Sequence, residues 1–257
     1  MNPLLELSQH GQSYWMDDLT RDMLVNGDLA RRVNEQGLRG ITSNPAIFDK
    51  AIAGSGAYDG QIERAAHEGQ TARQIYEEIT TADIRDACDV LRPVFESTQH
   101  ADGFVSLEVS PHLARDTQGS IDEARRLAAA VNRPNLFIKI PGTREGIPAI
   151  EALLFDGINV NITLLFSVGR YEAVAESYLR ALERRLEAGN PVDTIASVAS
   201  FFLSRIDVLV DELLAHRIRP DGGSAFEPHP KTLTGKTAVA NAKLAYRVFR
   251  RITSGER

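Results

Sequence analysis

The sequence predicts a (β/α) barrel, an α/β fold in which parallel strands alternate with helices. Two observations predict it. Strand-like and helix-like patterns alternate six times along the chain, which is typical of βαβ units. Several strands also carry polar side chains on one face only, mostly near their carboxyl ends. A sheet covered by helices on both sides favours two apolar faces, whereas a barrel turns one face of each strand into a lumen where active-site residues gather.

Composition is that of an ordinary soluble protein. The 257 residues are 43% hydrophobic and 25% charged, and one barrel domain over residues 1–257 is expected. The net charge of −6 argues against a general nucleic-acid binder. The single cysteine, Cys88, excludes an intramolecular disulfide and fits a small core residue. The sequence shows neither a secretory leader nor a run of about 18 apolar residues, so a cytoplasmic protein without a membrane anchor is expected.

The first strand-like segment is "SYWMDDL" at 13–19, and a helical stretch follows it with Gly37 as its expected C-cap. The second is "GLRGITSNPAIF" at 37–48. The glycines of "AGSGAYDGQ" predict a loop at 53–61.

Apolar residues at helical spacing predict a helix over 71–97. The strand-like segment "GFVSLEVSP" at 103–111 follows it. Ser120 and Glu123 form a capping-box pattern, so the next helix is expected to begin there. It leads to "NLFIKIPGT" at 135–143, a short apolar run that predicts a buried strand.

The fifth strand-like segment is "GINVNITLLFS" at 157–167, followed by an amphipathic helix that is expected to stop at Gly189. The sixth is "TIASVASFFLSRID" at 194–207. A proline- and glycine-rich loop is expected at 219–235, before a last helix at 237–252.

Polar residues share one face of these strands because side chains alternate with a period of two. The opposite face carries apolar residues in the third, fourth and fifth strands, and the contrast is weaker in the second, where Ile41 and Ser43 oppose Thr42 and Asn44. The residues expected to point into the lumen are Asp17, Asn44, Glu108, Lys139, Asn161 and Thr163.

Lys139 is the most informative residue because it interrupts an apolar run. Lysine is rarely buried without a partner, since its charged form loses hydration. A lysine desolvated in a barrel lumen can act as an amine nucleophile that forms a Schiff base with a carbonyl compound. Two structural alternatives stay open: a lysine on an edge strand whose amine reaches solvent, and a buried ion pair with Glu108.

The accompanying polar residues also have structural alternatives. Asp17 and Glu108 are carboxylates that could transfer protons, but Asp17 or Asp18 could instead cap a helix, and Glu108 could lie on a solvated face. Asn161 and Thr163 are commonly strand-end hydrogen-bonding residues. Ser200 and Arg205 flank the end of the sixth strand, where barrels tend to bind phosphate, although Arg205 could form a surface salt bridge.

Other motifs lack the required context. "TGKT" at 234–237 ends like a P-loop, but Pro230 occupies the position of the required glycine. "GSGAYDG" is not a dinucleotide fingerprint, and the six histidines show no metal-ligand spacing. No cofactor and no metal are therefore expected.

Six segments together resemble transaldolase of the actinobacterial and cyanobacterial type. They are "WMDDL", "GITSNPAIF", "FVSLEVSP", "LFIKIPGT", "NVNITLLFS" and "ASVASFFLSRID", in this order from about Ser13 onward. The resemblance implies a cofactor-free enzyme of the pentose phosphate pathway. Such an enzyme transfers a dihydroxyacetone unit from sedoheptulose 7-phosphate to glyceraldehyde 3-phosphate.

The resemblance also implies roles for individual residues. Lys139 matches the Schiff-base lysine, Asp17 the residue that handles the hydroxyl proton during C–C cleavage, and Glu108 with Thr163 the pair that positions a catalytic water. The substrate-binding residues implied are Asn44 and Asn161 for hydroxyl groups, and Ser200 and Arg205 for phosphate. A Lys139→Met variant is then expected to lose imine formation while its folding stays intact or improves slightly.

The resemblance implies a (β/α)8 TIM-barrel type of fold with about six βα units present in this chain. The family pattern continues with further strand and helix units, so the barrel is expected to be incomplete at its C-terminus, with possible oligomerisation or association through the open edge. A Schiff-base aldolase that does not transfer, and a non-catalytic interaction module, remain the alternatives.

Overall fold

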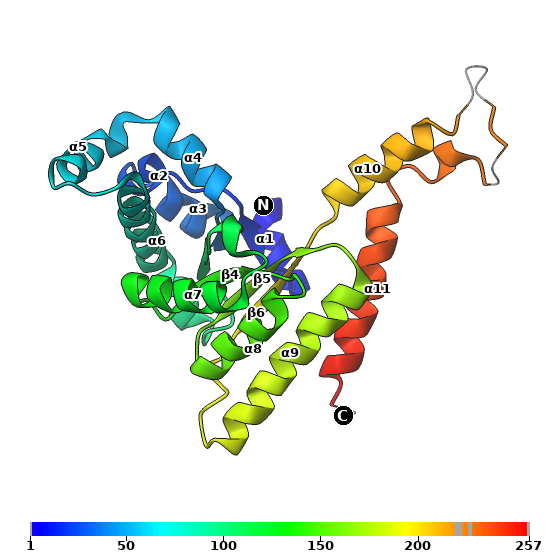
Figure 1. Cartoon of the computed structure of the whole chain (residues 1–257). Helices are drawn as coiled ribbons and strands as arrows, with labels where there is room; N and C mark the ends of the chain where they lie inside the picture. The colour runs from blue at the N-terminus through cyan, green and yellow to red at the C-terminus, as the bar shows by residue number, and fades with distance from the viewer. Residues whose placement is uncertain (1, 219–222, 226–227, 256–257) are drawn as a thin grey trace.

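The computed structural model describes residues 2–218, 223–225 and 228–255 and shows one curled sheet with most helices packed around it, while the helix at Ser204–Ala215 extends away from it (Figure 1). Six parallel strands follow one another in chain order, with β1 and β6 at the two edges. The half-barrel confirms the predicted class, a partial (β/α)8 TIM-barrel fold. The strands are β1 (Tyr14–Met16), β2 (Leu38–Thr42), β3 (Phe104–Glu108), β4 (Leu136–Pro141), β5 (Val160–Leu165) and β6 (Ser197–Phe201).

Helices connect successive strands, as a parallel sheet requires. None of the described helices is both long and apolar enough to cross a membrane. In chain order the α-helices are α1 (Pro3–Leu7), α2 (Arg21–Val25), α3 (Asp28–Gln36), α4 (Pro45–Gly54), α5 (Asp59–His67), α6 (Ala72–Ser97), α7 (Thr117–Val131), α8 (Gly146–Asp156), α9 (Val168–Glu187), α10 (Ser204–Ala215) and α11 (Thr237–Thr253). Single turns of 3₁₀ helix are η1 (Ser8–His10), η2 (Gly56–Tyr58), η3 (Pro111–Leu113) and η4 (Pro230–Thr232).

Most predicted boundaries are close to the observed ones. Helix α6 confirms the helix expected at 71–97, and Gly37 caps α3 with φ +70° as predicted. The stretch before Gly37 forms two helices, however, because the chain turns at Gly27, where φ is +77°. The loop expected at 219–235 lies partly outside the described residues.

Two local predictions are wrong. The glycine-rich segment at 53–61 is helical, because Ser55 accepts a hydrogen bond from the Ala57 amide and the side chain of Tyr58 is fully buried. Helix α7 begins one turn before Ser120, because Asp116 already caps it by accepting a bond from the Gly119 amide. Local N-caps and the burial of Tyr58 thus outweigh the two sequence patterns that gave the wrong predictions, a high glycine content at 53–61 and the capping-box spacing of Ser120 and Glu123.

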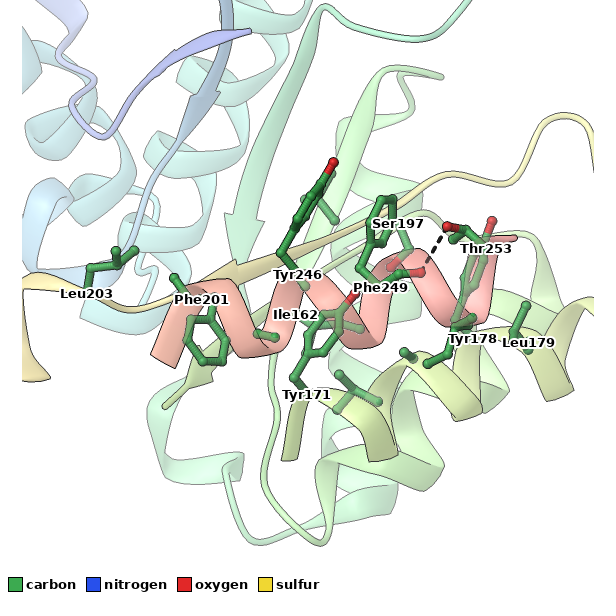
Figure 2. A pocket seen from close by; sticks show the side chains of 17 residues that line it. Ile162, Tyr171, Tyr178, Leu179, Ser197, Phe201, Leu203, Tyr246, Phe249 and Thr253 are labelled. Atoms are coloured by element: carbon green, nitrogen blue, oxygen red, sulfur yellow. Dashed lines mark hydrogen bonds between the residues drawn. The ribbon is translucent and has the colours of Figure 1, made fainter. Parts of the chain in front are cut away.

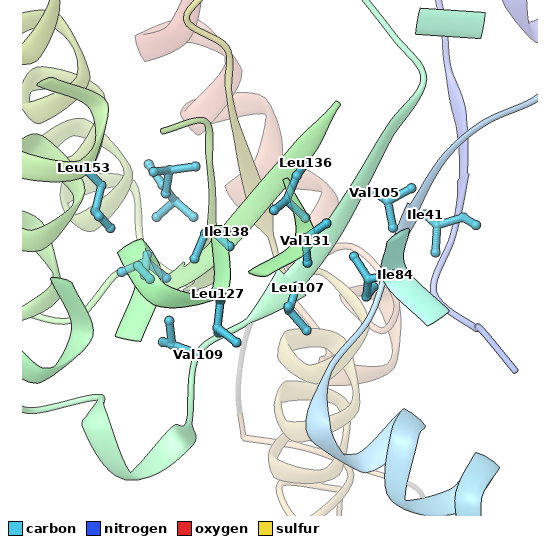
Figure 3. Close-up of a cluster of buried hydrophobic side chains, with 14 of the residues drawn as sticks. Ile41, Ile84, Val105, Leu107, Val109, Leu127, Val131, Leu136, Ile138 and Leu153 are labelled. Atoms are coloured by element: carbon cyan, nitrogen blue, oxygen red, sulfur yellow. The ribbon is translucent and has the colours of Figure 1, made fainter. Parts of the chain in front are cut away.

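The outer face of the sheet packs against the helices and forms the main hydrophobic core (Figure 3). Alternate strand residues such as Ile41, Val105 and Ile138 meet helix residues such as Ile84 and Leu127, and all five are almost fully buried. Burial of such side chains contributes about 1.5–3 kcal/mol each. The apolar face of the central strands therefore packs against the helices, and their opposite face is turned toward the lumen.

An aromatic cluster closes the amino-terminal end of the lumen. Phe104 and Phe137 stack with ring centroids 4.2 Å apart, and Trp15 lies 6.2 Å from Phe137. Gly40 makes room for this cluster, because a Cβ there would come within 2.2 Å of the Trp15 ring. Polar strand residues are thus found beyond this apolar floor, toward the carboxyl ends of the strands.

Gly103, just before β3, should tolerate no side chain. Its φ is +84°, and an added Cβ would lie 2.3 Å from the backbone nitrogen of Phe95. We expect Gly103→Ala to lower the free energy of unfolding by about 2–4 kcal/mol, as left-handed strain adds to a backbone clash. Urea denaturation measures this loss. Gly69→Ala is the matched control, because Gly69 has φ +79° with no atom within 4 Å, so an equal loss in both variants would contradict the clash.

A buried lysine and its neighbours form the candidate active site

Strand register brings three predicted residues side by side in the centre of the sheet. Glu108 of β3 is paired with Lys139 of β4, and Lys139 is paired with Asn161 of β5. Residues in register on neighbouring parallel strands point to the same side of a sheet. Lys139 and Asn161 are buried at 7% and 1% exposure, so this group lies within the protein and not on its surface.

The Lys139 amine is held by two acceptors. Its Nζ lies 3.1 Å from Oε2 of Glu108 and donates a hydrogen bond of 3.2 Å to the backbone carbonyl of Ser43. Of the two structural alternatives for Lys139, the edge strand is wrong, because β4 lies between β3 and β5. The buried ion pair with Glu108 is present. An ion pair at a central strand is compatible with catalysis, because the same carboxylate that compensates the charge can accept the proton.

Burial controls the acidity of Glu108. Its pKa is raised above the ordinary glutamate value because loss of hydration disfavours the carboxylate, and the opposing effect of the Lys139 charge is smaller. The Glu108 side chain is 16% exposed. A carboxyl group in this environment takes up a proton at higher pH than a glutamate in water, which suits a group that must both accept and return a proton.

A chain of hydrogen bonds links the strands around this pair. The Ser43 hydroxyl donates to the Ser106 carbonyl at 2.7 Å, and the Asn161 amide donates to the Ser106 hydroxyl at 2.9 Å. The Ser200 hydroxyl in turn donates to Oδ1 of Asn161 at 2.8 Å. The structure therefore brings Asn161 and Ser200 into one polar network that connects β3, β5 and β6 with the end of β2.

Two of the predicted site residues, Asn44 and Thr163, have structural roles in the backbone around them. Oδ1 of Asn44 accepts a hydrogen bond of 3.1 Å from the Ile47 amide and so caps α4. Thr163 is 1% exposed and is paired with Pro141 in the sheet. The register between β5 and β6 shifts between Ile162 and Leu165, and Leu164 has φ +59°, so the backbone next to Thr163 is irregular within the strand.

Asp17 and Arg205 lie at the surface. Asp17 is exposed in the loop after β1, and α2 is capped by Thr20 and by neither Asp17 nor Asp18, which corrects the alternative considered for them. The exposed Arg205 lies in the first turn of α10, and its guanidinium is 4.8 Å from the centre of the Phe202 ring. Among the described residues, neither side chain hydrogen-bonds to the Lys139 group.

The sequence pattern did not single out Ser43 and Ser106 as contacts. Ser106 lies on the predicted polar face of β3, so strand periodicity could have found it. Ser43 follows the last residue of β2, where the period of two no longer applies. Its contact with Ser106 joins residues 63 positions apart, which no local pattern predicts.

An apolar groove elsewhere on the molecule offers no comparable chemistry. It has a volume of about 600 Å³ and lies between β6, α9 and α11, on the outer side of the sheet (Figure 2). Aromatic residues of α9 and α11 such as Tyr171, Tyr178, Tyr246 and Phe249 line it. Its lining contains no lysine, carboxylate or histidine, so the groove lacks a group suited to carbonyl chemistry.

Metal ligands do not gather at the site or elsewhere in the described part of the chain, where no three His, Cys, Asp or Glu side chains are placed to hold an ion.

The curled parallel sheet and the polar group at its carboxyl-terminal side define a TIM-barrel type of protein. Comparison with known proteins then identifies the family. The family described as Transaldolase/Fructose-6-phosphate aldolase matches residues 14–255. The chain belongs to this family.

Several relatives match the whole chain or nearly so. "Transaldolase 2" of Nostoc punctiforme is 51% identical over 257 residues, which are 100% of this chain and 68% of that protein. "Transaldolase" of Trichodesmium erythraeum is 47% identical over 256 residues, 100% of this chain and 67% of the relative. "Transaldolase" of Thermobifida fusca is 48% identical with the same coverage, 100% and 67%. The chain thus spans about two thirds of the length of these relatives.

Proposed function

We propose that this protein is a transaldolase that transfers a dihydroxyacetone unit from sedoheptulose 7-phosphate to glyceraldehyde 3-phosphate through a Schiff base on Lys139. The observation that carries the proposal is the Lys139 amine, buried on a central strand and held by Glu108 and the Ser43 carbonyl in a member of this family. The implied pathway is the pentose phosphate pathway, and the expected location is the cytoplasm. No cofactor is required, because the lysine itself supplies the electrophilic group once it has become an imine.

Imine formation begins with a proton transfer within the buried pair. Glu108 accepts a proton from the Lys139 ammonium, across the 3.1 Å that separate Nζ and Oε2, and the neutral amine adds to the ketone carbon of the donor sugar. The positive charge of Lys139 lowers the pKa of Glu108. Once that charge is lost, burial alone acts on the carboxyl and raises its pKa, so Glu108 keeps the proton. It then gives this proton to the carbinolamine hydroxyl, which leaves as water, and Thr163 helps to position that water.

Carbon–carbon cleavage follows once the protonated imine can accept electrons. Asp17 removes the proton from the sugar hydroxyl on the carbon that becomes the new aldehyde, and the bond between this carbon and the dihydroxyacetone unit breaks. Erythrose 4-phosphate leaves, and the electrons of the broken bond form an enamine on Lys139. Asn161 and Asn44 hold the hydroxyl groups of this enamine. The Asn161 amide is already fixed by Ser106 and Ser200, which favours one orientation of the bound unit. Attack on glyceraldehyde 3-phosphate and hydrolysis of the imine give fructose 6-phosphate and the free amine.

Ser200 and Arg205 would bind the phosphate of the sugars. Ser200 lies on β6, and Arg205 is the second residue of the helix that follows it, so both are at the carboxyl-terminal end of this strand. Barrels use this end of their later strands for phosphate, and an exposed guanidinium can form a bidentate contact with it.

Borohydride trapping tests the proposal directly. The protein is incubated with fructose 6-phosphate, the imine is reduced, and peptide mass spectrometry locates the adduct. We expect a three-carbon dihydroxyacetone adduct on Lys139 alone, because loss of glyceraldehyde 3-phosphate leaves this unit on the lysine. A folded protein that carries no adduct, or an adduct on an exposed lysine such as Lys50, would refute the Schiff-base assignment.

An aldolase that releases dihydroxyacetone without transfer is the second candidate, because the matched family includes fructose-6-phosphate aldolases. Product analysis with and without an acceptor aldehyde separates the two. A transaldolase forms the new sugar phosphate only when the acceptor is present and accumulates little free dihydroxyacetone in its absence. Steady release of dihydroxyacetone without an acceptor would instead support the aldolase.

A further inference from the structure

We propose that Ser43 is a positioning residue for Lys139. Its backbone carbonyl holds the amine in the orientation needed for attack, and its side-chain hydroxyl fixes that carbonyl in place. The inference deepens the function proposed above and rests on it for its role in catalysis. It starts from the contact between Nζ of Lys139 and the Ser43 carbonyl oxygen, which are 3.2 Å apart.

The bond to Ser43 differs from the bond to Glu108 in one respect that matters for the reaction. The attraction between Lys139 and Glu108 is ionic and disappears when the ammonium transfers its proton to the carboxylate. A backbone carbonyl is a neutral acceptor, so it can still accept a hydrogen bond from the uncharged amine. At the moment of attack on the sugar, the Ser43 carbonyl is therefore the acceptor that keeps Nζ oriented.

The Ser43 carbonyl is held from both sides. The Ser43 hydroxyl, fully buried, donates to the Ser106 carbonyl of β3 at 2.7 Å. The next residue, Asn44, is fixed as the N-cap of α4 by its bond to the Ile47 amide. Only Ser43 and the cap residue Asn44 lie between the end of β2 and the start of α4, and the Ser43 hydroxyl anchors this short connection to the neighbouring strand. Loss of this anchor should let the carbonyl move relative to Nζ.

Ser43→Ala removes the anchor, and the sheet offers a matched control. The Ser197 hydroxyl of β6 donates to the Val160 carbonyl of β5 at 2.9 Å, which is the same kind of bond between neighbouring strands, without a contact to the lysine. Ser197→Ala therefore removes a comparable hydrogen bond between strands but leaves the surroundings of Lys139 unchanged. Any effect that follows only from lost stability appears in both variants.

The first measurement is the rate of borohydride-trapped imine on Lys139 with fructose 6-phosphate. We expect Ser43→Ala to lower the maximal rate by about ten- to a hundredfold, since small displacements of a reacting group have effects of this size. The half-saturating sugar concentration should stay within about twofold of wild type, because the anchor acts on the amine and not on sugar binding. Ser197→Ala should match wild type in both.

The second measurement needs no sugar. Brief acetylation with acetic anhydride labels lysines according to the reactivity of their amines, and the exposed Lys50 serves as the internal standard. The ratio of Lys139 to Lys50 labelling should fall in Ser43→Ala and stay unchanged in Ser197→Ala. If wild type forms no imine, the proposed function fails, while this ratio still decides the role of Ser43.

Equal imine rates and equal labelling ratios in Ser43→Ala and Ser197→Ala would overturn the inference. If Ser43→Ala does not fold, Ser43→Cys takes its place, because a thiol of similar size is only a weak donor. The cysteine variant should then show the same slower imine formation and lower labelling ratio. A cysteine variant with wild-type values would overturn the inference equally.

Discussion

Lys139→Met should form no borohydride-stable adduct with fructose 6-phosphate and should have no measurable transfer activity. Methionine resembles the lysine stem in size but has no amine, so the covalent intermediate cannot form. A variant that still converts sugar phosphate would refute the assignment of the nucleophile. Peptide mass spectrometry and a coupled assay of sugar-phosphate transfer measure the two losses.

The ion pair with Glu108 changes what this variant is expected to do to stability. From the sequence alone, replacing a buried amine should leave folding intact or improve it slightly. The structure shows that the substitution also strips Glu108 of its partner. Removing one partner of a buried ion pair lowers the free energy of unfolding by about 3 kcal/mol or more, because the charge of the other partner is left uncompensated.

This loss of stability should depend on pH. Without Lys139 the folded-state pKa of Glu108, already raised by burial, rises further above its unfolded value. The folded state then holds a proton that the unfolded state has released, so the stability of the variant falls as pH rises through this window and recovers at acid pH. Urea denaturation at acid and neutral pH measures the difference.

The double variant Lys139→Met with Glu108→Gln is the matched control. It removes both charges and keeps the volume, so its stability should lie within about 1 kcal/mol of wild type at neutral pH. Its adduct formation should be as completely lost as in Lys139→Met. A double variant as unstable as the single one would show that the unpaired carboxylate is not the cause.

The central pair could be predicted from sequence because it depends on local periodicity. Lys139 interrupts a short apolar run, and Glu108 lies on the polar face of another strand, so the period of two and parallel pairing bring them together. The same reasoning placed Asn161 on the polar face of the fifth strand. The alternating pattern is a direct consequence of one apolar face packing on helices.

Contacts that depend on where an element ends could not be predicted in the same way. Ser43 lies one residue past β2, and its partners come from β3 and β4. The sequence predicts the start of α7 at the wrong residue because Asp116 and Ser120 are both good N-cap residues. The structure shows that Asp116 is the cap, since its side chain accepts a hydrogen bond from the Gly119 amide. The contacts of Ser43 are set by tertiary packing, which the local sequence does not encode, whereas the cap of α7 is a local bond between residues three positions apart.

Glu108→Gln should slow imine formation on Lys139 by about a hundredfold, which is the lower range for loss of a general acid–base group. The amide can still accept a hydrogen bond from Nζ, but it cannot take the ammonium proton or return it to the leaving hydroxyl. Trapping rates at a saturating sugar concentration measure this loss. Adducts should still form slowly on Lys139, which separates this variant from Lys139→Met.

The pH profile gives the sharper test of Glu108. In wild type the rate should fall as pH drops through the Glu108 pKa, because a protonated carboxyl cannot accept the proton of Lys139. Since burial raises this pKa, the fall should begin at higher pH than for an ordinary glutamate. Glu108→Gln should lack this acid limb, and Glu108→Asp, which keeps the carboxyl on a shorter side chain, should retain it at a lower rate. An acid limb that persists in Glu108→Gln would assign the titration to another group and remove Glu108 from the proton transfer.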